Sequence, residues 1–343
     1  MPRQERQPLE PSAIWCCPQC REALQFTSDD AVCGTCDRRY ACIGGIFDFR
    51  LDGAAWLDLD EDRALARELA AMGGTAHDLA LHVFRQRPTW TAERAARQAR
   101  QTMAAVEERR TDLQSWLAPL GQATGCVLDV GCGPGALLAA LASNGVPSIG
   151  IDVALSWLVV AAALIREHGG TPMLAAAFGE ALPLRDEAVA GAASLDVIEH
   201  VAGVPAYLSE LFRVMQPGAV LALSTPNRFS LGAEPHVGVW GVGWMPRRWQ
   251  RGYAERRSGL PYGSTWLLSR WELARRVQAA GFSAQINAPT IPDAAILAFT
   301  RRRAALARAY NFLVPTFPFR QVGLCFGPFF RVIASRPSRS SRA

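Results

Sequence analysis

Over the C-terminal two-thirds of the chain, short apolar runs alternate with longer segments that have the length of helices. Short apolar runs at 126–130, 148–152 and 189–195 have the length of buried strands, and the segments at 135–145 and 157–170 have the length of helices. Strands that alternate with helices in this way predict a doubly wound, mostly parallel α/β sheet. Ligands of such sheets lie at the carboxyl ends of the strands.

The same alternation continues toward the C-terminus, with two interruptions. We expect a helix at about 204–219, which stops at a Pro-Gly pair, and then a strand at 220–227. A late helix at 268–282 is followed by a strand at 283–289, and the last strand is postponed to 329–337. The interruptions, at about 228–266 and 291–325, are too long for ordinary loops and are predicted to be insertions.

Residues 51–118 have a different composition, rich in Ala, Arg, Glu and Leu, and their apolar positions recur roughly at helical spacing. Gly73, Gly74 and Pro88 divide this segment into at least two helices. Two interpretations of the segment stay open. It is a scaffold packed on the main domain, or a helical cap that excludes water from an active site.

The bulk composition is that of a globular protein with a sizeable core. Half of the 343 residues are hydrophobic, and the net charge of +5 comes from arginine alone, because the chain contains no lysine. A GC-rich genome explains this bias more simply than selection for nucleic-acid binding. The polar, Pro-rich first twelve residues lack the apolar core of a signal peptide, and the longest apolar run, 153–165, is shorter than a membrane span of about 20 residues. We therefore expect a cytoplasmic protein.

Four of the nine cysteines form two CxxC pairs separated by twelve residues. Cys17, Cys20, Cys33 and Cys36 thus have the spacing of a zinc ribbon, in which four thiolates hold a tetrahedral Zn²⁺. Four protein ligands leave no open position for water or substrate, so we expect a structural zinc. The predicted ribbon occupies residues 1–50.

The glycine-rich stretch "VLDVGCGPG" at 127–135 is compatible with two different cofactors. Gly131, Gly133 and Ala136 satisfy the dinucleotide fingerprint, and Asp152 follows the first glycine by 21 residues, where a ribose-binding acid belongs. Asp129 at the end of the first strand would repel a pyrophosphate but would pair with an ammonium group. S-adenosylmethionine carries an ammonium and a ribose and no phosphate, so Asp129 favours it.

With its neighbours, this stretch resembles the class I S-adenosylmethionine-dependent methyltransferases. The resemblance covers roughly 119–290 and rests on five motifs in the family's order: "VLDVGCGPG" (127–135), "GID" (150–152), "GEALPL" (179–184), "LDVIEHV" (195–201) and "LFRVMQPGAVLALSTPN" (211–227). It implies a seven-stranded Rossmann-like methyltransferase domain over 119–343, carrying both predicted insertions.

The resemblance also implies where the cofactor binds. Asp129 would lie near the amino group of the methionine portion, the glycine loop along that portion, and Asp152 at both ribose hydroxyls. Many relatives place an Asp for the adenine amino group where this chain has Phe178, so here we expect backbone groups and stacking to hold the adenine. The expected cofactor-binding residues are Asp129, Gly131, Cys132, Gly133, Gly135, Asp152, Val153, Gly179, Glu180 and Ala181.

The motif "DVIEHV" supplies candidate catalytic groups. Asp196, Glu199 and His200 have the spacing i, i+3 and i+4, which places them on one face if the segment is helical. This piece is most similar to the quinone-pathway O-methyltransferases, whose equivalent residues can hold a divalent cation that acidifies a phenol. Two other roles stay open. His200 acts as the base or contacts the acceptor, or these side chains only shape the pocket floor.

The first insertion is the candidate acceptor pocket. Five of the ten tryptophans lie between 240 and 271, among glycines and arginines. Such a mixture can stack on bases, bind a carboxylate or phosphate, lie at a lipid interface, or simply pack as a lid. The second insertion is apolar and aromatic and either packs on the cap or touches a membrane surface. The residues singled out in the first insertion are His236, also a candidate catalytic residue, Trp240, Trp244, Arg247 and Arg248.

These observations predict methyl transfer from S-adenosylmethionine to a small-molecule or lipid-linked acceptor, at oxygen. One alternative is a ribosomal or transfer RNA methyltransferase that uses its zinc ribbon on RNA. Related ribbons typically close with Cys and His where this chain has Cys33 and Cys36, and no basic stripe is evident. A second alternative is a zinc-ribbon interaction protein with a vestigial methyltransferase fold. The oligomeric state is not predicted.

Overall fold

The computed structural model describes residues 11–51, 53, 57–291, 296 and 300–338. The chain forms two compact units: the first holds 1–193, 209–220 and 338–343, and the second holds 194–208 and 221–337. The N-terminal residues 1–10, and parts of the predicted cap and second insertion, lie outside the described residues. None of the described helices is long and apolar enough to cross a membrane.

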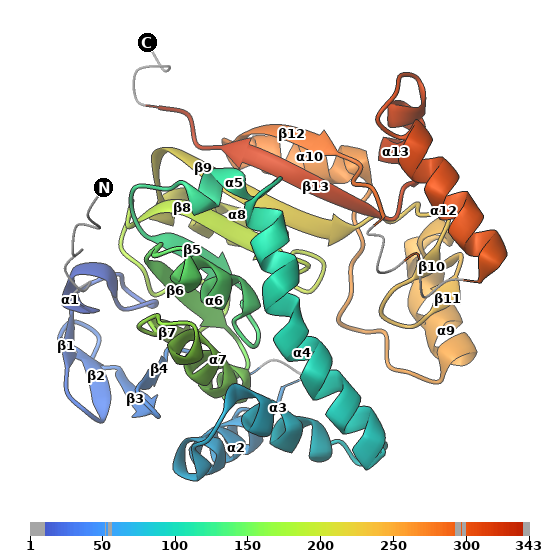
Figure 1. The fold of residues 1–343 in the computed structure, drawn as a ribbon. Coiled ribbons are helices and arrows are strands. Elements are labelled where there is room, and N and C mark those ends of the chain that lie inside the picture. Colours follow the sequence, from blue (N-terminus) through green and yellow to red (C-terminus); the bar gives the residue numbers. More distant parts are fainter. Residues whose placement is uncertain (1–10, 52, 54–56, 292–295, 297–299, 339–343) are drawn as a thin grey trace. The chain divides into compact units, whose positions relative to one another are not determined.

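The first unit begins with four short antiparallel strands that form the predicted ribbon. These are β1 (Leu24–Phe26), β2 (Asp30–Cys33), β3 (Arg39–Ile43) and β4 (Ile46–Asp48), preceded by the short helix α1 (Pro11–Ile14). Strand β4 then pairs in parallel with β7 (Leu174–Ala176). The ribbon is therefore the edge of the main sheet and not a separate layer (Figure 1).

The parallel strands of the same unit follow the predicted alternation. Strands β5 (Val127–Val130), β6 (Ser148–Asp152) and β7 pair in parallel, with α6 (Ala136–Ser143) after β5 and α7 (Leu155–Glu167) after β6. All residues of β5 and β7 are buried, as apolar runs without alternation predict. In this unit the strand order runs β1-β2-β3-β4-β7-β6-β5-β8-β9, where only the first residues of β8 (Val189–Leu195) and β9 (Met215–Pro226) belong to it.

Three helices from the 51–118 segment pack on the sheet's own helices. They are α2 (Leu59–Met72), α3 (Ala76–Arg85) and α4 (Ala92–Leu113), followed by the single turn α5 (Ala118–Gly121). Helices α2 and α3 pack against α7, and α4 packs against α3 and α6. Asp58, Thr75 and Thr91 cap the three N-termini with their side chains. This packing is that of a scaffold; the domain limits at 50 and 118 stay a prediction, because the compact units follow other boundaries.

The second unit contains the ends of β8 and β9 and both insertions. Its strand order is β8-β9-β13-β12, and β12 (Ser283–Asn287) pairs antiparallel with the postponed last strand β13 (Phe329–Ser335). The seven strands predicted for the sheet are thus β5–β9, β12 and β13, which confirms the predicted fold class. The remaining elements of this part of the chain are α8 (Val204–Val214, shared between the units), β10 (Ala233–Glu234), β11 (Val239–Trp240), the 3-10 turn η1 (Val242–Trp244), α9 (Arg247–Ser258), α10 (Arg270–Ala279), α12 (Arg301–Leu313) and α13 (Phe319–Phe326).

Two local features differ from the sequence prediction. Residues 196–200 form a turn and not a helix, with Asp196 in a left-handed conformation (φ 58°). Strand β9 starts at Met215 and runs through Pro217 and Gly218, which were expected to end a helix. Gly218 has φ 84°, a left-handed conformation that glycine adopts without the steric strain of a Cβ.

Candidate functional site

The glycine loop between β5 and α6 folds back on the end of β6. The backbone N–H groups of Gly131 and Cys132 both donate to the carbonyl of Ile151, at 2.7 and 3.2 Å. Gly131 and Gly133 have positive φ, and a Cβ on Gly133 would meet no atom within 4 Å, so the loop is open at that point. Gly135 is different, because a Cβ there would lie 2.8 Å from the Cβ of Ala161. This glycine lets α6 approach α7 closely.

Two carboxylates lie at this loop, at the ends of adjacent strands. Asp152 accepts hydrogen bonds from the N–H groups of Gly133 and Ala154, each at 2.8 Å, which joins the loop to the start of α7. Asp129 is buried, and burial raises its pKa to about 7, with Asp152 adding to the rise and Arg109 opposing it. A buried carboxylate with an uncompensated desolvation cost is suited to a cationic ligand. Asp129, Asp152 and the loop glycines are thus brought together as predicted.

The predicted adenine stretch starts beside the same acid. The N–H of Ala177 donates to the carbonyl of Asp152 at 3.0 Å, and Ala181 closes a turn by donating to Phe178 at 3.1 Å. Residues 179–181 therefore follow directly from the end of β7, as the motif order implies. Their contact with adenine stays a prediction.

A buried acid that the sequence analysis missed supports this region. Asp62 of α2 accepts hydrogen bonds from the N–H of Leu155 at 2.8 Å and from both the N–H and the hydroxyl of Ser156, at 3.1 and 2.7 Å. These groups form the N-terminus of α7, directly after Asp152. A carboxylate at this position satisfies unpaired N–H donors and interacts favourably with the helix dipole.

Arg50 connects Asp62 to the ribbon. Its guanidinium donates to Asp62 at 2.5 Å, to the carbonyl of Val153 at 2.8 Å, and to both carboxylate oxygens of Asp48 at the end of β4. Its side chain is fully buried, and the paired carboxylates keep its pKa above the usual value despite that burial. Arg63 adds a further hydrogen bond to Asp48. The sequence carries no signal for this network, because charged residues on an amphipathic helix normally face solvent.

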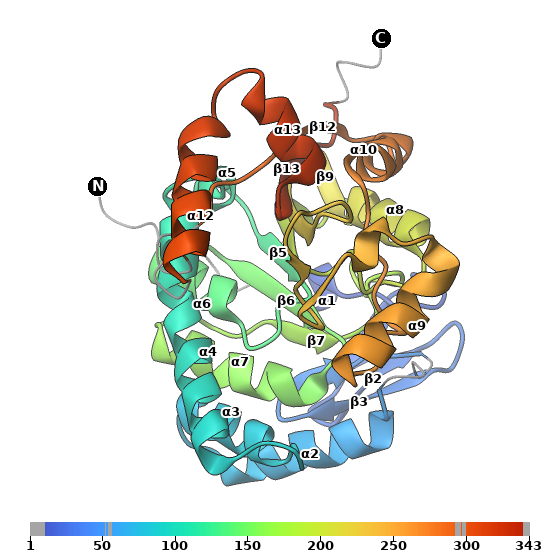
Figure 2. The ribbon, with the colours of Figure 1, turned by 90° about the vertical axis from the view of Figure 1, so that its right-hand side faces the viewer.

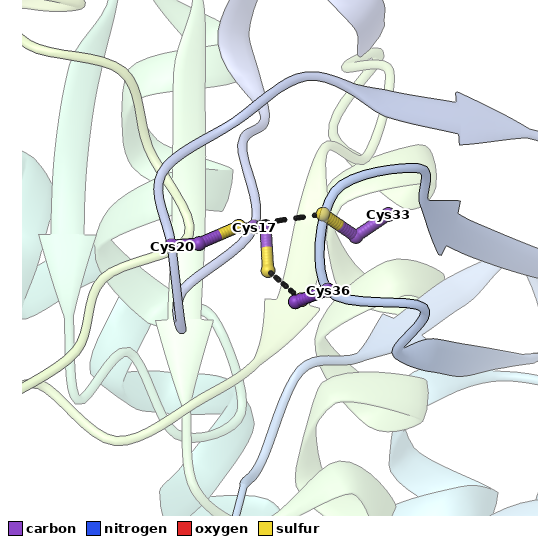
Figure 3. Close-up of side chains that lie close together, drawn as sticks. All are labelled: Cys17, Cys20, Cys33 and Cys36. Atoms are coloured by element: carbon purple, nitrogen blue, oxygen red, sulfur yellow. Dashed lines mark hydrogen bonds between the residues drawn. The ribbon is translucent and has the colours of Figure 1, made fainter.

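The four ribbon cysteines converge as predicted (Figure 3). The sulfur atoms of Cys17 and Cys36 are 3.6 Å apart, those of Cys20 and Cys33 are 3.4 Å apart, and all four lie within 4.8 Å of one another. Zn–S bonds of about 2.3 Å in a tetrahedron place sulfur atoms about 3.8 Å apart, so the cluster fits a structural Zn²⁺.

Tyr40 supports this cluster from β3. Its hydroxyl lies 3.1 Å from the sulfur of Cys17, and the pKa of Cys17 is lowered to about 7, with hydrogen bonds from Tyr40 and the backbone outweighing burial. A thiol with a lowered pKa is a good metal ligand. Tyr40 itself is buried and packs edge-on against Phe49, at 5.0 Å between ring centroids.

In the second unit, three side chains could hold another ion or a polar ligand. Glu199, His200 and His236 offer ligand atoms within 4.8 Å of one another. The two imidazole rings meet edge to face, with centroids 4.7 Å apart. His236 comes from the first insertion, between β10 and β11. Asp196 is not part of this group, because its carboxylate accepts a hydrogen bond from the Ser224 hydroxyl at 2.9 Å. The expected cation set of Asp196, Glu199 and His200 is therefore corrected to one with His236 in place of Asp196.

The hydrogen bonds around this group leave specific atoms available. His236 Nδ1 lies 2.5 Å from Glu234 and His200 Nδ1 lies 3.3 Å from the carbonyl of Ser264, which leaves both Nε2 atoms for a ligand. Glu199 accepts from the Thr225 hydroxyl with one oxygen, whereas its other oxygen, Oε1, is buried without a partner among the described residues. Burial raises the pKa of Glu199 to about 7 and lowers the pKa of His200. At His236 burial lowers the pKa, but the neighbouring Glu234 carboxylate raises it, and the net result is a raised pKa.

The other insertion residues have different surroundings. Arg247 lies over the ring of Trp266 at 4.0 Å and donates to Glu272 at 2.6 Å, while its Nη1 is buried without a partner among the described residues. Arg248 lies over Trp249. Trp240 and Trp244 are 62% and 44% exposed, so they are not buried lid residues. Of the four residues singled out here, Arg247 is the one with a buried donor that has no partner among the described residues; the buried Tyr262 hydroxyl of the same insertion is a second such group.

Comparison with protein families identifies one match. A family model described as a methyltransferase domain matches residues 105–285. This range contains the glycine loop, both cofactor-site carboxylates and the Glu199 group, and it excludes the ribbon and the second insertion.

Curated relatives and solved structures are similar to parts of the chain. The chain is 32% identical over 129 residues to a ubiquinone biosynthesis O-methyltransferase of Maricaulis maris, covering 35% of this chain and 49% of that protein. It is 40% identical over 98 residues to an uncharacterized methyltransferase of Mycolicibacterium vanbaalenii, covering 29% and 38%. The alignments thus span about half or less of these relatives. A Haemonchus contortus phosphoethanolamine N-methyltransferase 2 aligns at TM-score 0.47 with 17% identity, covering 78% and 61%.

Proposed function

Because the chain belongs to the methyltransferase-domain family, which its match over 105–285 establishes, we propose that it transfers a methyl group from S-adenosylmethionine to oxygen of a small-molecule or lipid-linked acceptor. One observation supports S-adenosylmethionine as the methyl donor. Asp129 and Asp152 lie at the ends of adjacent parallel strands beside the open Gly133 backbone. The first suits an ammonium group and the second suits ribose hydroxyls.

The fit to S-adenosylmethionine follows from charge. A dinucleotide would place its pyrophosphate at the glycine loop, beside the buried carboxylate of Asp129. The negative charges of the pyrophosphate and the carboxylate would repel each other. The methionine ammonium instead removes the desolvation cost of that carboxylate. Asp152 has both oxygens held by backbone donors, and each oxygen keeps a lone pair for a ribose hydroxyl.

The acceptor part rests on Glu199, whose Oε1 is buried without a partner among the described residues. A ligand that donates to this oxygen, or a divalent cation bound by Glu199, His200 and His236, would satisfy it. A bound cation would supply Lewis acidity toward an acceptor hydroxyl. The residues themselves orient the acceptor, and when no cation is bound the Nε2 atom of His200 can take up the hydroxyl proton. Oxygen as the methylated atom is suggested by the relatives named as ubiquinone biosynthesis O-methyltransferases.

Three variants test these assignments separately. Asp152→Ala is expected to weaken S-adenosylmethionine binding at least tenfold in calorimetric titration, because one buried acceptor pair is lost. Glu199→Gln is expected to bind the cofactor normally and to transfer labelled methyl groups at least 100-fold more slowly. Glu108→Gln, an exposed acid on α4, serves as the matched control for both.

The class of the acceptor is identified by the fraction of a cell extract that takes up the labelled methyl group. The wild-type protein is incubated with methyl-labelled S-adenosylmethionine and cell extract, and lipid, small-molecule, RNA and protein fractions are counted. Label in the lipid or small-molecule fraction supports the proposal. Label confined to RNA, with binding that weakens steeply as salt rises, would overturn it.

A further inference from the structure

Helices α12 and α13 of the second insertion, whose ribbons Figure 2 shows, carry exposed aromatic side chains. We call this surface the aromatic face and define it by six side chains whose exposed fractions range from 38% to 82%. Large apolar side chains rarely gather on a solvent-exposed surface without a partner. The members are Trp244, Phe312, Phe317, Phe319, Val322 and Phe326.

The face has a defined geometry. Phe319, Val322 and Phe326 follow one another at i, i+3 and i+7 on α13, so they share one side of that helix. The helix is fixed from behind, because Leu324 is buried and a Cβ on Gly323 would collide with Val314 at the end of α12. The exposed side of α13 is therefore held outward by packing.

The first insertion extends the same face. The Trp244 ring stacks on Phe326, with centroids 5.8 Å apart and planes 12° apart. Its indole N–H donates to the carbonyl of Ser230 at 3.0 Å, so the exposed ring needs no water for its polar atom. The backbone of Leu231, which is 63% exposed, donates to Phe326. An aromatic side chain with a satisfied polar atom and an exposed ring suits a membrane interface.

The helix that carries part of this face is also rich in positive charge. Between residue 294 and the C-terminus the sequence has nine arginines and no Asp or Glu. Arg301, Arg302, Arg303 and Arg308 are exposed on α12, and among the described residues none of the four forms an ion pair. A surface that combines exposed aromatic side chains with exposed arginines is complementary to anionic lipid head groups.

We propose that the aromatic face docks on the surface of a bilayer that contains anionic lipids. The aromatic side chains reach the boundary between head groups and acyl chains, and the four arginines of α12 bind phosphate groups. The eight residues of α13 lie along the surface and do not cross it. Docking deepens the proposed function, since it brings the enzyme to a lipid-linked acceptor, but it is measured without methyl transfer.

The full-length protein is sedimented with phosphatidylcholine vesicles that contain or lack phosphatidylglycerol. Binding is expected with phosphatidylglycerol, and it should weaken as salt rises. The variant R301Q/R302Q/R303Q is expected to bind about 100-fold more weakly, because each arginine near an anionic surface contributes about fivefold. The variant F317S/F319S is expected to lose at least tenfold on the same vesicles.

Controls separate docking from other effects. Leu260→Ser removes an exposed apolar side chain on another part of the first insertion and should leave vesicle binding unchanged. Equal binding to both vesicle types, or binding unaffected by the arginine and phenylalanine changes, overturns the proposal. If those changes instead abolish self-association in ultracentrifugation and leave vesicle binding intact, the face contacts a second copy of the chain and the proposal is also wrong.

The outcome is independent of the proposed function. The variants F317S/F319S and R301Q/R302Q/R303Q are expected to bind S-adenosylmethionine normally and to methylate a water-soluble phenol at the wild-type rate. If the wild type binds vesicles but transfers no methyl group, the proposed function is wrong and the proposed docking surface is supported. If the wild type methylates soluble acceptors but does not bind vesicles, the proposed function is supported and the proposed docking surface is wrong.

Discussion

The Asp62 carboxylate caps helix α7, whose second residue is Ser156, by accepting from the Ser156 N–H at 3.1 Å and from its hydroxyl at 2.7 Å. The two residues are 94 positions apart in the sequence, and Ser156 lies four residues after Asp152. Arg50 holds the same carboxylate from the other side and also binds the carbonyl of Val153. The conformation of the proposed ribose-binding turn is therefore determined from outside the motif that defines it.

Asp62→Asn tests this support. The amide keeps the size of the side chain but offers one acceptor oxygen to four donors, so we expect a loss of about 1–3 kcal/mol in the free energy of unfolding. Affinity for S-adenosylmethionine should fall several-fold because the turn becomes less ordered. Urea denaturation and calorimetric titration measure the two effects. Asp60→Asn on the same helix is the control, since the Asp60 side chain is 93% exposed and forms a surface ion pair with Arg63. A cofactor affinity unchanged in Asp62→Asn would refute the positioning role.

Asp129 predicts the pH dependence of cofactor binding. Its pKa is about 7 in the free protein because of burial, and an ammonium ligand lowers that pKa by pairing with the carboxylate. Binding then releases a proton at pH values below about 7. Affinity should therefore fall, by up to about tenfold per pH unit, as the pH drops from 7 to 5, and stay level above 7.

The matched variant for this pH effect is Asp129→Asn. It should bind S-adenosylmethionine more weakly at pH 8 and show a flatter profile, since the titrating group is gone. Calorimetric titrations at five pH values give both profiles. Identical slopes in the wild type and the variant would show that another group controls binding.

Cys17→Ser tests the metal assignment of the ribbon. Loss of one of four thiolates should reduce bound zinc well below one per chain and lower the free energy of unfolding by several kcal/mol. Because β4 pairs with β7 and carries Asp48 of the Arg50 network, the cofactor affinity should also drop. Atomic absorption, denaturation and titration measure these quantities. Cys42→Ser, outside the cluster, should keep its zinc; full zinc content in Cys17→Ser would contradict the assignment.

Gly150 tests how closely β6 approaches its neighbours. A Cβ there would lie 2.5 Å from Leu138, 2.6 Å from Leu174 and 2.9 Å from the sulfur of Cys132 in the glycine loop. Gly150→Ala should therefore cost about 1–3 kcal/mol and weaken cofactor binding by displacing the loop. Gly34→Ala meets no atom within 4 Å and should change stability by less than about 0.5 kcal/mol. Thermal denaturation of both proteins decides the comparison, and equal melting temperatures would contradict it.

Several parts of the fold and site could be predicted because they are encoded locally. Strands β5, β6 and β8 are short, mostly apolar runs, and the structure places them within one residue of the predicted bounds. The cysteine spacing and the loop glycines likewise depend on neighbours a few residues away. Asp196 shows the limit of local patterns. Its spacing from Glu199 suits a helix, but the chain turns there, and the carboxylate binds Ser224 instead.

By itself, the sequence determined the alternation of elements, the cluster of four cysteines and the glycine loop with its two acids, because backbone propensity and short-range spacing specify each of them. Only the tertiary structure decided that His236 joins Glu199 and His200, that Asp62 and Arg50 hold the start of α7, and that the ribbon extends the sheet through β4. Such contacts join residues tens of positions apart. They depend on how buried elements pack, and hydrophobic periodicity fixes which face of an element is buried but not which distant side chain meets it.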